Sequence, residues 1–97
     1  MNVGVCKVTP RLPENHSLKG KRRVVSSLCS RVRNKFNVAV SEVGDNEAWQ
    51  VTTIGITCVS NSGRIAEQIL DGVISYIESS PEDIELLDSQ VEAISGF

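Results

Sequence analysis

The sequence predicts an α+β fold in which two helices cover one face of a four-stranded antiparallel sheet. Three observations lead to this fold: six segments follow the order β-α-β-β-α-β, the two halves of that order are alike, and 97 residues suffice for one modest core. This order is the split βαβ, or ferredoxin-like, arrangement, in which the strands lie in the order 4-1-3-2. We expect a single ferredoxin-like domain spanning residues 1–97.

The first half of the chain supplies a strand, a long helix and a second strand. Residues 2–9 are rich in β-branched side chains and stop at Pro10, which is typical of a strand. Ser17 is a favoured N-cap residue, so we expect a helix from there to about Phe36, followed by a strand over residues 37–43. The apolar residues of this helix recur on one face: Leu18, Val25, Leu28, Cys29, Val32 and Phe36.

The second half repeats this pattern after a turn. The turn is expected at residues 44–46, and the third strand at residues 49–59. Polar residues and a glycine at 60–63 interrupt the chain before a second helix over about 64–79. A last strand over residues 83–94 completes the sheet.

The third strand alternates between the two faces of the predicted sheet. One set should point toward the helices: Ile54, Ile56 and Cys58. The opposite, open face carries a set that is only partly polar: Trp49, Val51, Thr53, Gly55, Thr57 and Val59. Apolar side chains on an open face favour a partner, most simply a second copy, so we expect a homodimer through Trp49, Val51 and Val59. Residues 51–59 contain no aromatic residue, which disfavours base stacking on the sheet.

Positive charge is concentrated in the first 41 residues. They hold nine of the ten Lys and Arg residues and only one of the twelve acids, Glu14. Residues 42–97 hold the other eleven acids and a single base, Arg64. The net charge is therefore +8 in the first part and −10 in the second, beneath a total of −2. This distribution directs the search for a function to the first helix.

The start of the first helix gathers cations where acids are normally favoured. The candidate site comprises Ser17, Lys19, Lys21, Arg22 and Arg23. Each cation there costs about 0.3–1 kcal/mol through the helix dipole, and Gly20 adds about 1 kcal/mol relative to Ala. Such conflicts are typical of functional sites. Two interpretations stay open: an anion site that binds phosphate, or solvated side chains with the stem of Arg22 packed along the core.

A second basic group, Arg31, Arg33 and Lys35, lies at the other end of this helix, where cations complement the dipole. Arg31 also shares an outward polar stripe with Lys19 and Arg23, along roughly 30 Å at about 1.5 Å per residue. A stripe without acids fits a nucleic-acid backbone better than a small metabolite. We therefore expect contacts to RNA or the ribosome, with Arg31 and Lys35 extending the track.

Residue types that would support catalysis are sparse. His16 is the single histidine, and three cysteines fall on apolar faces that should be buried: Cys6, Cys29 and Cys58. There is no phosphate-binding loop, dinucleotide fingerprint or zinc or calcium spacing, so we expect no enzyme, no cofactor and no metal. The acids should be solvated or paired with the basic helix. The odd cysteine count and the lack of a leader or long apolar run predict a cytoplasmic protein with no membrane contact.

Four short strings along the chain share a spacing with a known family. They are Ser17-Leu18-Lys19-x-Lys21-Arg22, Phe36-Asn37-Val38, Glu42-Val43-Gly44-Asp45 and Trp49-Gln50. The chain resembles, over nearly its whole length, the YlxP-like family of small uncharacterised bacterial proteins. This resemblance implies a ferredoxin-like fold. Because genes of the family often lie among those for translation and ribosome assembly, it also implies a role linked to RNA or the ribosome. Gly20 stands where relatives often carry a polar residue.

Three hypotheses follow from these observations. The first is an RNA- or ribosome-associated protein without enzymatic activity that binds through its basic helix. The second is a protein-interaction or homodimerisation module in which the basic helix meets an acidic partner. The third is a small-anion or nucleotide site at the Ser17 end of the helix.

Overall fold

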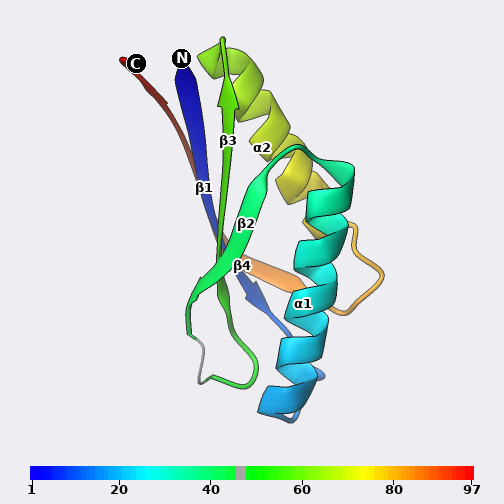
Figure 1. Cartoon of the computed structure of the whole chain (residues 1–97). Coiled ribbons are helices and arrows are strands. Elements are labelled where there is room, and N and C mark those ends of the chain that lie inside the picture. The colour runs from blue at the N-terminus through cyan, green and yellow to red at the C-terminus, as the bar shows by residue number, and fades with distance from the viewer. Residues whose placement is uncertain (46–47) are drawn as a thin grey trace.

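The computed structural model describes residues 1–45 and 48–97, and its elements follow the predicted order (Figure 1). The strands are β1 (Asn2–Arg11), β2 (Ala39–Gly44), β3 (Thr53–Ser60) and β4 (Glu85–Ser95), and the helices are α1 (Leu18–Lys35) and α2 (Gly63–Glu78). The turn expected at residues 44–46 ends in Asn46, which lies outside the described residues. Asp45, directly before it, has a φ of 59°, which is the left-handed conformation that turns use.

The four strands form one antiparallel sheet in the order β2-β3-β1-β4. This is the predicted order, counted from the other edge. Both helices lie on the same side of the sheet, with α1 beside β2 and α2 across β1, β3 and β4 (Figure 1). The prediction of a ferredoxin-like α+β fold is confirmed. Neither helix in the described part of the chain is long and apolar enough to span a membrane.

The hydrophobic core lies between the helices and one face of the sheet. Cys6 and Val8 of β1 meet the predicted inward set of β3, in which Ile54, Ile56 and Cys58 are at most 5% exposed. The helices close the core with eight buried side chains: Val25, Leu28, Cys29 and Val32 of α1, and Ala66, Leu70, Val73 and Ile77 of α2. Burial of each large aliphatic side chain stabilises the fold by about 1.5–3 kcal/mol, so this core holds both helices against the sheet.

β1 continues two residues beyond its predicted end at residue 9. The register with β4 shifts between Thr9 and Pro10, which marks a bulge. A bulge tolerates proline because the ladder is already interrupted there. The Pro10 carbonyl still accepts the Thr52 N–H at 3.1 Å, so the chain stays attached on its other side. The prediction that Pro10 ends the strand is wrong for this reason.

β3 begins at Thr53, four residues later than predicted. Before it, an isolated bridge joins Val51 to Arg11. The carbonyl groups of Ala48 and Val51 accept hydrogen bonds from a lysine of α1 instead of from a continuous ladder. Trp49 therefore lies in the connection between β2 and β3. The prediction that placed it on the open face of the sheet is wrong.

Candidate functional site

The first turn of α1 is a capped helix terminus covered by an asparagine side chain. The Ser17 hydroxyl accepts the Gly20 N–H at 2.9 Å, which confirms Ser17 as the N-cap. Asn15 lies across this turn, and its Nδ2 donates to the Ser17 carbonyl at 2.7 Å. A Cβ atom on residue 20 would collide with Asn15 Oδ1. This close approach explains Gly20 without a ligand.

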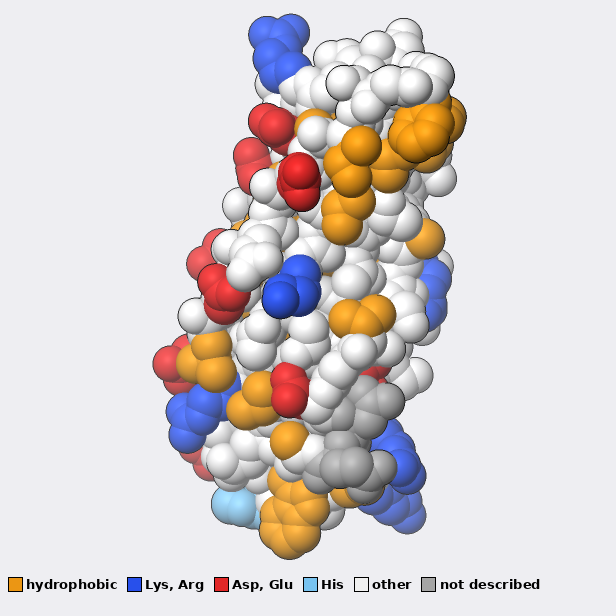
Figure 2. Space-filling view, turned by 90° about the vertical axis from the view of Figure 1, so that its left-hand side faces the viewer, with side chains coloured by type: hydrophobic (Ala, Val, Ile, Leu, Met, Phe, Trp, Pro, Cys, Tyr) orange, Lys and Arg blue, Asp and Glu red, His pale blue; other side chains and the backbone are white. Residues whose placement is uncertain are grey.

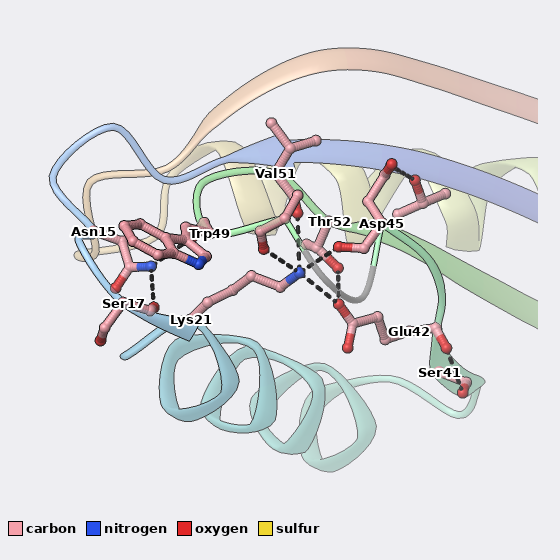
Figure 3. A network of polar contacts seen from close by, with 11 residues as sticks. Asn15, Ser17, Lys21, Ser41, Glu42, Asp45, Trp49, Val51 and Thr52 are labelled. Carbon is pink, nitrogen blue, oxygen red and sulfur yellow. Dashed lines mark hydrogen bonds and ion pairs between the residues drawn. The ribbon is translucent and has the colours of Figure 1, made fainter. Parts of the chain in front are cut away.

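Lys21 is fully buried, with 0% of its side chain exposed (Figure 3). Its ammonium group donates to three backbone carbonyl groups in the connection between β2 and β3. They belong to Asp45, Ala48 and Val51, at 2.5, 2.7 and 3.1 Å from Nζ. An ammonium group has three protons, so these carbonyl groups occupy all of them. Lys21 has no donor left for a phosphate, which corrects its place in the predicted cluster.

Glu42 supplies the negative charge beside Lys21. Its Oε2 lies 3.3 Å from Lys21 Nζ and also accepts the hydroxyl of the buried Thr52. The sequence contained a signal for this burial, because Lys21 lies one helical turn before Val25 on the apolar face of α1. Charge alone had grouped Lys21 with its sequence neighbours, whereas helical periodicity assigns it to the core.

The outer side of α1 carries four exposed cations. Lys19, Arg22, Arg23 and Arg33 are exposed, and none of them forms an ion pair with a residue that the structure describes. The residues between them are exposed and uncharged: Ser26, Ser27, Ser30 and Asn34. The helix contains no acid. The predicted acid-free stripe is therefore present with Lys19 and Arg23, and it also includes Arg22 and Arg33.

Arg31 and Lys35 lie on the flanks of α1 and contact groups of the same molecule. Arg31 Nη2 lies 2.7 Å from Glu82 Oε2, and the two side chains are 27% and 29% exposed. Burial raises the pKa of the Glu82 carboxyl, but hydrogen bonds from Ser80 and its own N–H, together with Arg31, lower the pKa below its ordinary value. Lys35 Nζ lies 5.5 Å from the centre of the Tyr76 ring, a cation–π contact. Arg31, which was predicted to belong to the outer stripe, thus forms an ion pair with Glu82 on the flank of the helix.

Trp49 lies beside the start of α1, although it belongs to the connection between β2 and β3 (Figure 3). Its carbonyl accepts Asn15 Nδ2 at 2.5 Å. Gln50 Nε2 donates to the carbonyl groups of Asn15 and Pro13, at 3.1 and 3.3 Å. The Trp49 residue itself remains 60% exposed. Contacts between two loops therefore bring this tryptophan next to the basic helix, which periodicity could not predict.

The open face of the sheet carries exposed apolar side chains among charged ones (Figure 2). One comes from each strand: Val5, Val43, Val59 and Ile94, which are 40%, 61%, 66% and 41% exposed. Lys7 and Glu92 lie among them. Of the predicted interface residues, Val59 belongs to this face and the half-buried Val51 lies at its end, whereas Trp49 does not belong to it.

The three cysteines are buried, as predicted. Burial, with a smaller effect of Asp71, raises the pKa of the Cys6 thiol to about 11. Burial also raises the pKa of the Cys29 thiol. The raised pKa keeps the thiols of Cys6 and Cys29 protonated at neutral pH. Over residues 1–45 and 48–97, no three His, Cys, Asp or Glu side chains converge so as to hold a metal ion.

Comparison with known proteins places this chain in a family. The family model described as "Protein of unknown function (DUF503)" matches residues 3–91. The "Uncharacterized protein YlxP" of Bacillus subtilis (strain 168) is 47% identical over 66 residues, which are 68% of this chain and 72% of that protein. Among solved structures, "De novo designed protein Foldit4" aligns over 100% of both chains with a TM-score of 0.54 and 15% identity, a likeness of fold alone. The resemblance to YlxP is confirmed, and the chain belongs to the DUF503 family.

Proposed function

We propose that this protein binds RNA, or an RNA surface of the ribosome, in the cytoplasm through the outer side of α1. The observation that carries this proposal is the acid-free side of the helix with four exposed cations: Lys19, Arg22, Arg23 and Arg33. Cations that neutralise phosphates release condensed counterions, and this release supplies most of the affinity for a nucleic-acid backbone. No catalytic step is part of the proposal.

The distribution of ion pairs supports an external polyanion as the ligand. Arg11, Lys21 and Arg31 each pair with an acid of the same chain. The four outer cations pair with none of the described residues, although the chain has more acids than bases. Positive charge that remains unpaired on one helix side, in an acidic chain, favours a partner that brings its own negative charge.

The length of the stripe favours RNA over a small anion. Lys19 and Arg33 are separated by fourteen residues of the same helix, which is about 21 Å at about 1.5 Å per residue. A single phosphate or nucleotide could contact only one end of such a track. Two groups that the small-anion hypothesis needs are already engaged within the protein. The Ser17 hydroxyl accepts the Gly20 N–H, and the Lys21 ammonium group donates to three backbone carbonyl groups.

A matched pair of charge variants tests this proposal. Lys19→Gln with Arg23→Gln removes two charges from α1, and Arg11→Gln with Arg64→Gln removes two charges from other elements. We would measure fluorescence anisotropy of a labelled RNA hairpin with a single-stranded loop, from about 50 to about 200 mM salt. The α1 variant should reduce the slope of log K against log salt by about 1.4–1.8, at about 0.7–0.9 per charge. The control variant should keep the wild-type slope.

Two outcomes would contradict the proposal. Equal loss of slope in both variants would mean that RNA attraction is a diffuse effect of net charge. No binding by the wild-type protein at the lowest salt would remove RNA as a ligand, and the basic helix would then be a docking surface for an acidic protein.

We infer a second candidate function, self-association through the open face of the sheet, from its exposed apolar side chains. The four strands contain 10, 6, 8 and 11 residues and together cover about 550 Å², at about 3.3 Å per residue and about 4.8 Å between strands. The smallest specific interfaces bury about 600 Å² on each partner, so this face is close to the area that a small dimer interface needs.

The charges on the open face fit a second copy of the same chain. Lys7 lies opposite Gln90, and Glu92 lies opposite Val5, in the ladder between β1 and β4. In a two-fold symmetric pair, the Lys7 of one protomer can meet the Glu92 of the other twice over. Because the charges of this face complement each other in a symmetric pair, we propose that a second copy of the chain covers it.

Sedimentation velocity of matched variants tests the dimer. Val59→Asp places a charge on the open face, whereas Ile65→Asp places one on α2, where Ile65 is also exposed, at 43%. The wild-type protein and Ile65→Asp should sediment as dimers and Val59→Asp as a monomer. A wild-type protein that sediments as a monomer at its highest soluble concentration would exclude the dimer.

A further inference from the structure

We propose that Trp49 stacks on an unpaired base, so that the ligand of this protein is RNA with a loop, bulge or single-stranded end. The inference rests on the proposed RNA binding by α1 and names the class of RNA. Uninterrupted duplex RNA keeps its bases stacked and out of reach of a side chain, whereas unpaired bases are free to stack on an aromatic ring.

Trp49 is exposed in a position that the other aromatic residues do not share. The Phe36 and Tyr76 rings pack edge to face, with centroids 5.8 Å apart, against the core. Phe97 is exposed at the far end of the sheet, where its carbonyl accepts the N-terminal ammonium of Met1 at 2.6 Å. Trp49 alone lies at the end where α1 begins. A large exposed indole is typical of a residue that contributes its surface to a partner.

The backbone around Trp49 is held by hydrogen bonds that leave the ring in solvent. Asn15 donates to the Trp49 carbonyl, and Lys21 donates to the carbonyl groups of Ala48 and Val51 on either side of it. Gln50 adds two hydrogen bonds to the loop before α1. The core does not hold the indole itself, which is 60% exposed. An aromatic ring on an ordered backbone loses little conformational entropy when it binds, which favours affinity.

The position of Trp49 relative to the cations fits a nucleotide. Asn15 joins Trp49 to the start of α1, because its Nδ2 also donates to the Ser17 carbonyl, two residues before Lys19 (Figure 3). A base stacked on the indole extends its sugar and phosphate toward this turn, where the exposed side chains of Lys19, Arg22 and Arg23 begin the stripe. Stacking and phosphate contact together are the usual means of binding single-stranded nucleic acid.

Fluorescence of Trp49 tests the inference directly, because it is the single tryptophan of the chain. We would titrate the full-length protein at low salt with a short single-stranded oligoribonucleotide and with the same sequence as a duplex. Stacking should quench the fluorescence with the single strand and leave it unchanged with the duplex. Trp49→Leu should weaken single-strand binding about tenfold, without a change in the salt slope, and Trp49→Phe should retain most of the affinity.

The variant with Lys19→Gln and Arg23→Gln separates the two proposals. If that variant loses salt slope while Trp49→Leu binds as tightly as the wild type, RNA binding stands and base stacking is overturned. If the wild type binds neither RNA, both proposals fail. If Trp49→Leu changes the sedimentation of the RNA-free protein, Trp49 belongs to a protein interface, which also overturns stacking.

Discussion

The inner and outer sides of helix α1 use the same residue type in opposite ways. Lys21, on the inner side, is 0% exposed and donates to three carbonyl groups beside Glu42. Lys19, on the outer side, is exposed and forms no ion pair with a described residue. Two residues correspond to about 200° of rotation at about 3.6 residues per turn, which separates their environments. A run of cations at a helix start is therefore two sets of residues with separate roles.

The two sides of α1 also differ in their contacts with the rest of the protein. On the inner side, Lys21 fixes the connection between β2 and β3, which carries Trp49. On the outer side, Lys19, Arg22 and Arg23 form no ion pair with a described residue, and Arg33 donates only to the Val40 carbonyl, at 3.4 Å. Their charges remain available to a ligand. Lys21 on the inner side thus helps to position Trp49, the proposed stacking residue, and the outer side supplies the positive charge for the proposed RNA ligand.

The largest effect that would sharpen this comparison is on stability. Lys21→Met should lower the free energy of unfolding by about 3 kcal/mol, because removal of one member of a buried pair leaves its partner uncompensated. It also leaves three carbonyl groups without their donor. Lys19→Met should change the stability by less than about 0.5 kcal/mol. Urea unfolding followed by circular dichroism measures both.

A second variant separates the charge of Lys21 from its packing. In the Lys21→Met background, Glu42→Gln should recover part of the lost stability, because it removes the carboxylate that was left without a partner. Equal destabilisation by Lys19→Met and Lys21→Met would contradict the division of α1 into two sides.

Most of the fold could be predicted because it depends on local periodicity. The alternation of Ile54, Ile56 and Cys58 identified the inward face of β3, and the Ser17 cap placed the start of α1 correctly. The end of β1 could not be predicted from Pro10, because the strand accommodates this proline only at a bulge in its pairing with β4.

The candidate site was harder to predict because its contacts join distant segments. Lys21 is buried because carbonyl groups 24 to 30 residues away converge on it. The general exposure of lysine argues against such burial, and only its helical position next to Val25 favours it. The placement of Trp49 depends likewise on Asn15, which is 34 residues away in the chain.

A smaller effect is expected where the two sides of α1 meet. Gly20→Ala should gain about 1 kcal/mol from helix propensity. The new Cβ must displace the Asn15 side chain, however, and each of the two hydrogen bonds lost is worth about 0.5–1.5 kcal/mol. We expect a net loss of up to about 2 kcal/mol in urea unfolding. In an Asn15→Ala background the same substitution should stabilise the protein, and destabilisation in both backgrounds would contradict this explanation of Gly20.

The smallest effect concerns Arg31, on the flank between the two sides. Its partner Glu82 has a pKa below the ordinary value of 4.5, because hydrogen bonds and Arg31 outweigh the effect of burial. A lowered native pKa means that the unfolded chain binds more protons in acid. The stabilisation from Glu82 is therefore fully present when the pH is above the ordinary pKa of the carboxyl. It is lost as the pH falls through the lowered pKa of the native state. Both side chains are more than a quarter exposed, so the contribution should stay below about 1 kcal/mol.

Glu82→Gln should therefore differ most from the wild type near neutral pH and approach it in acid. Unfolding free energies between about pH 7 and pH 3 measure this gap, since that range brackets the titration of a carboxyl group. Asp83→Asn provides the control, because Asp83 is the exposed neighbouring acid and forms no ion pair with a described residue. A gap of the same pH dependence in both variants would mean that Arg31 is solvated like Lys19. Arg31 would then join the outer stripe, and RNA binding should weaken in Arg31→Gln as it does in Arg23→Gln.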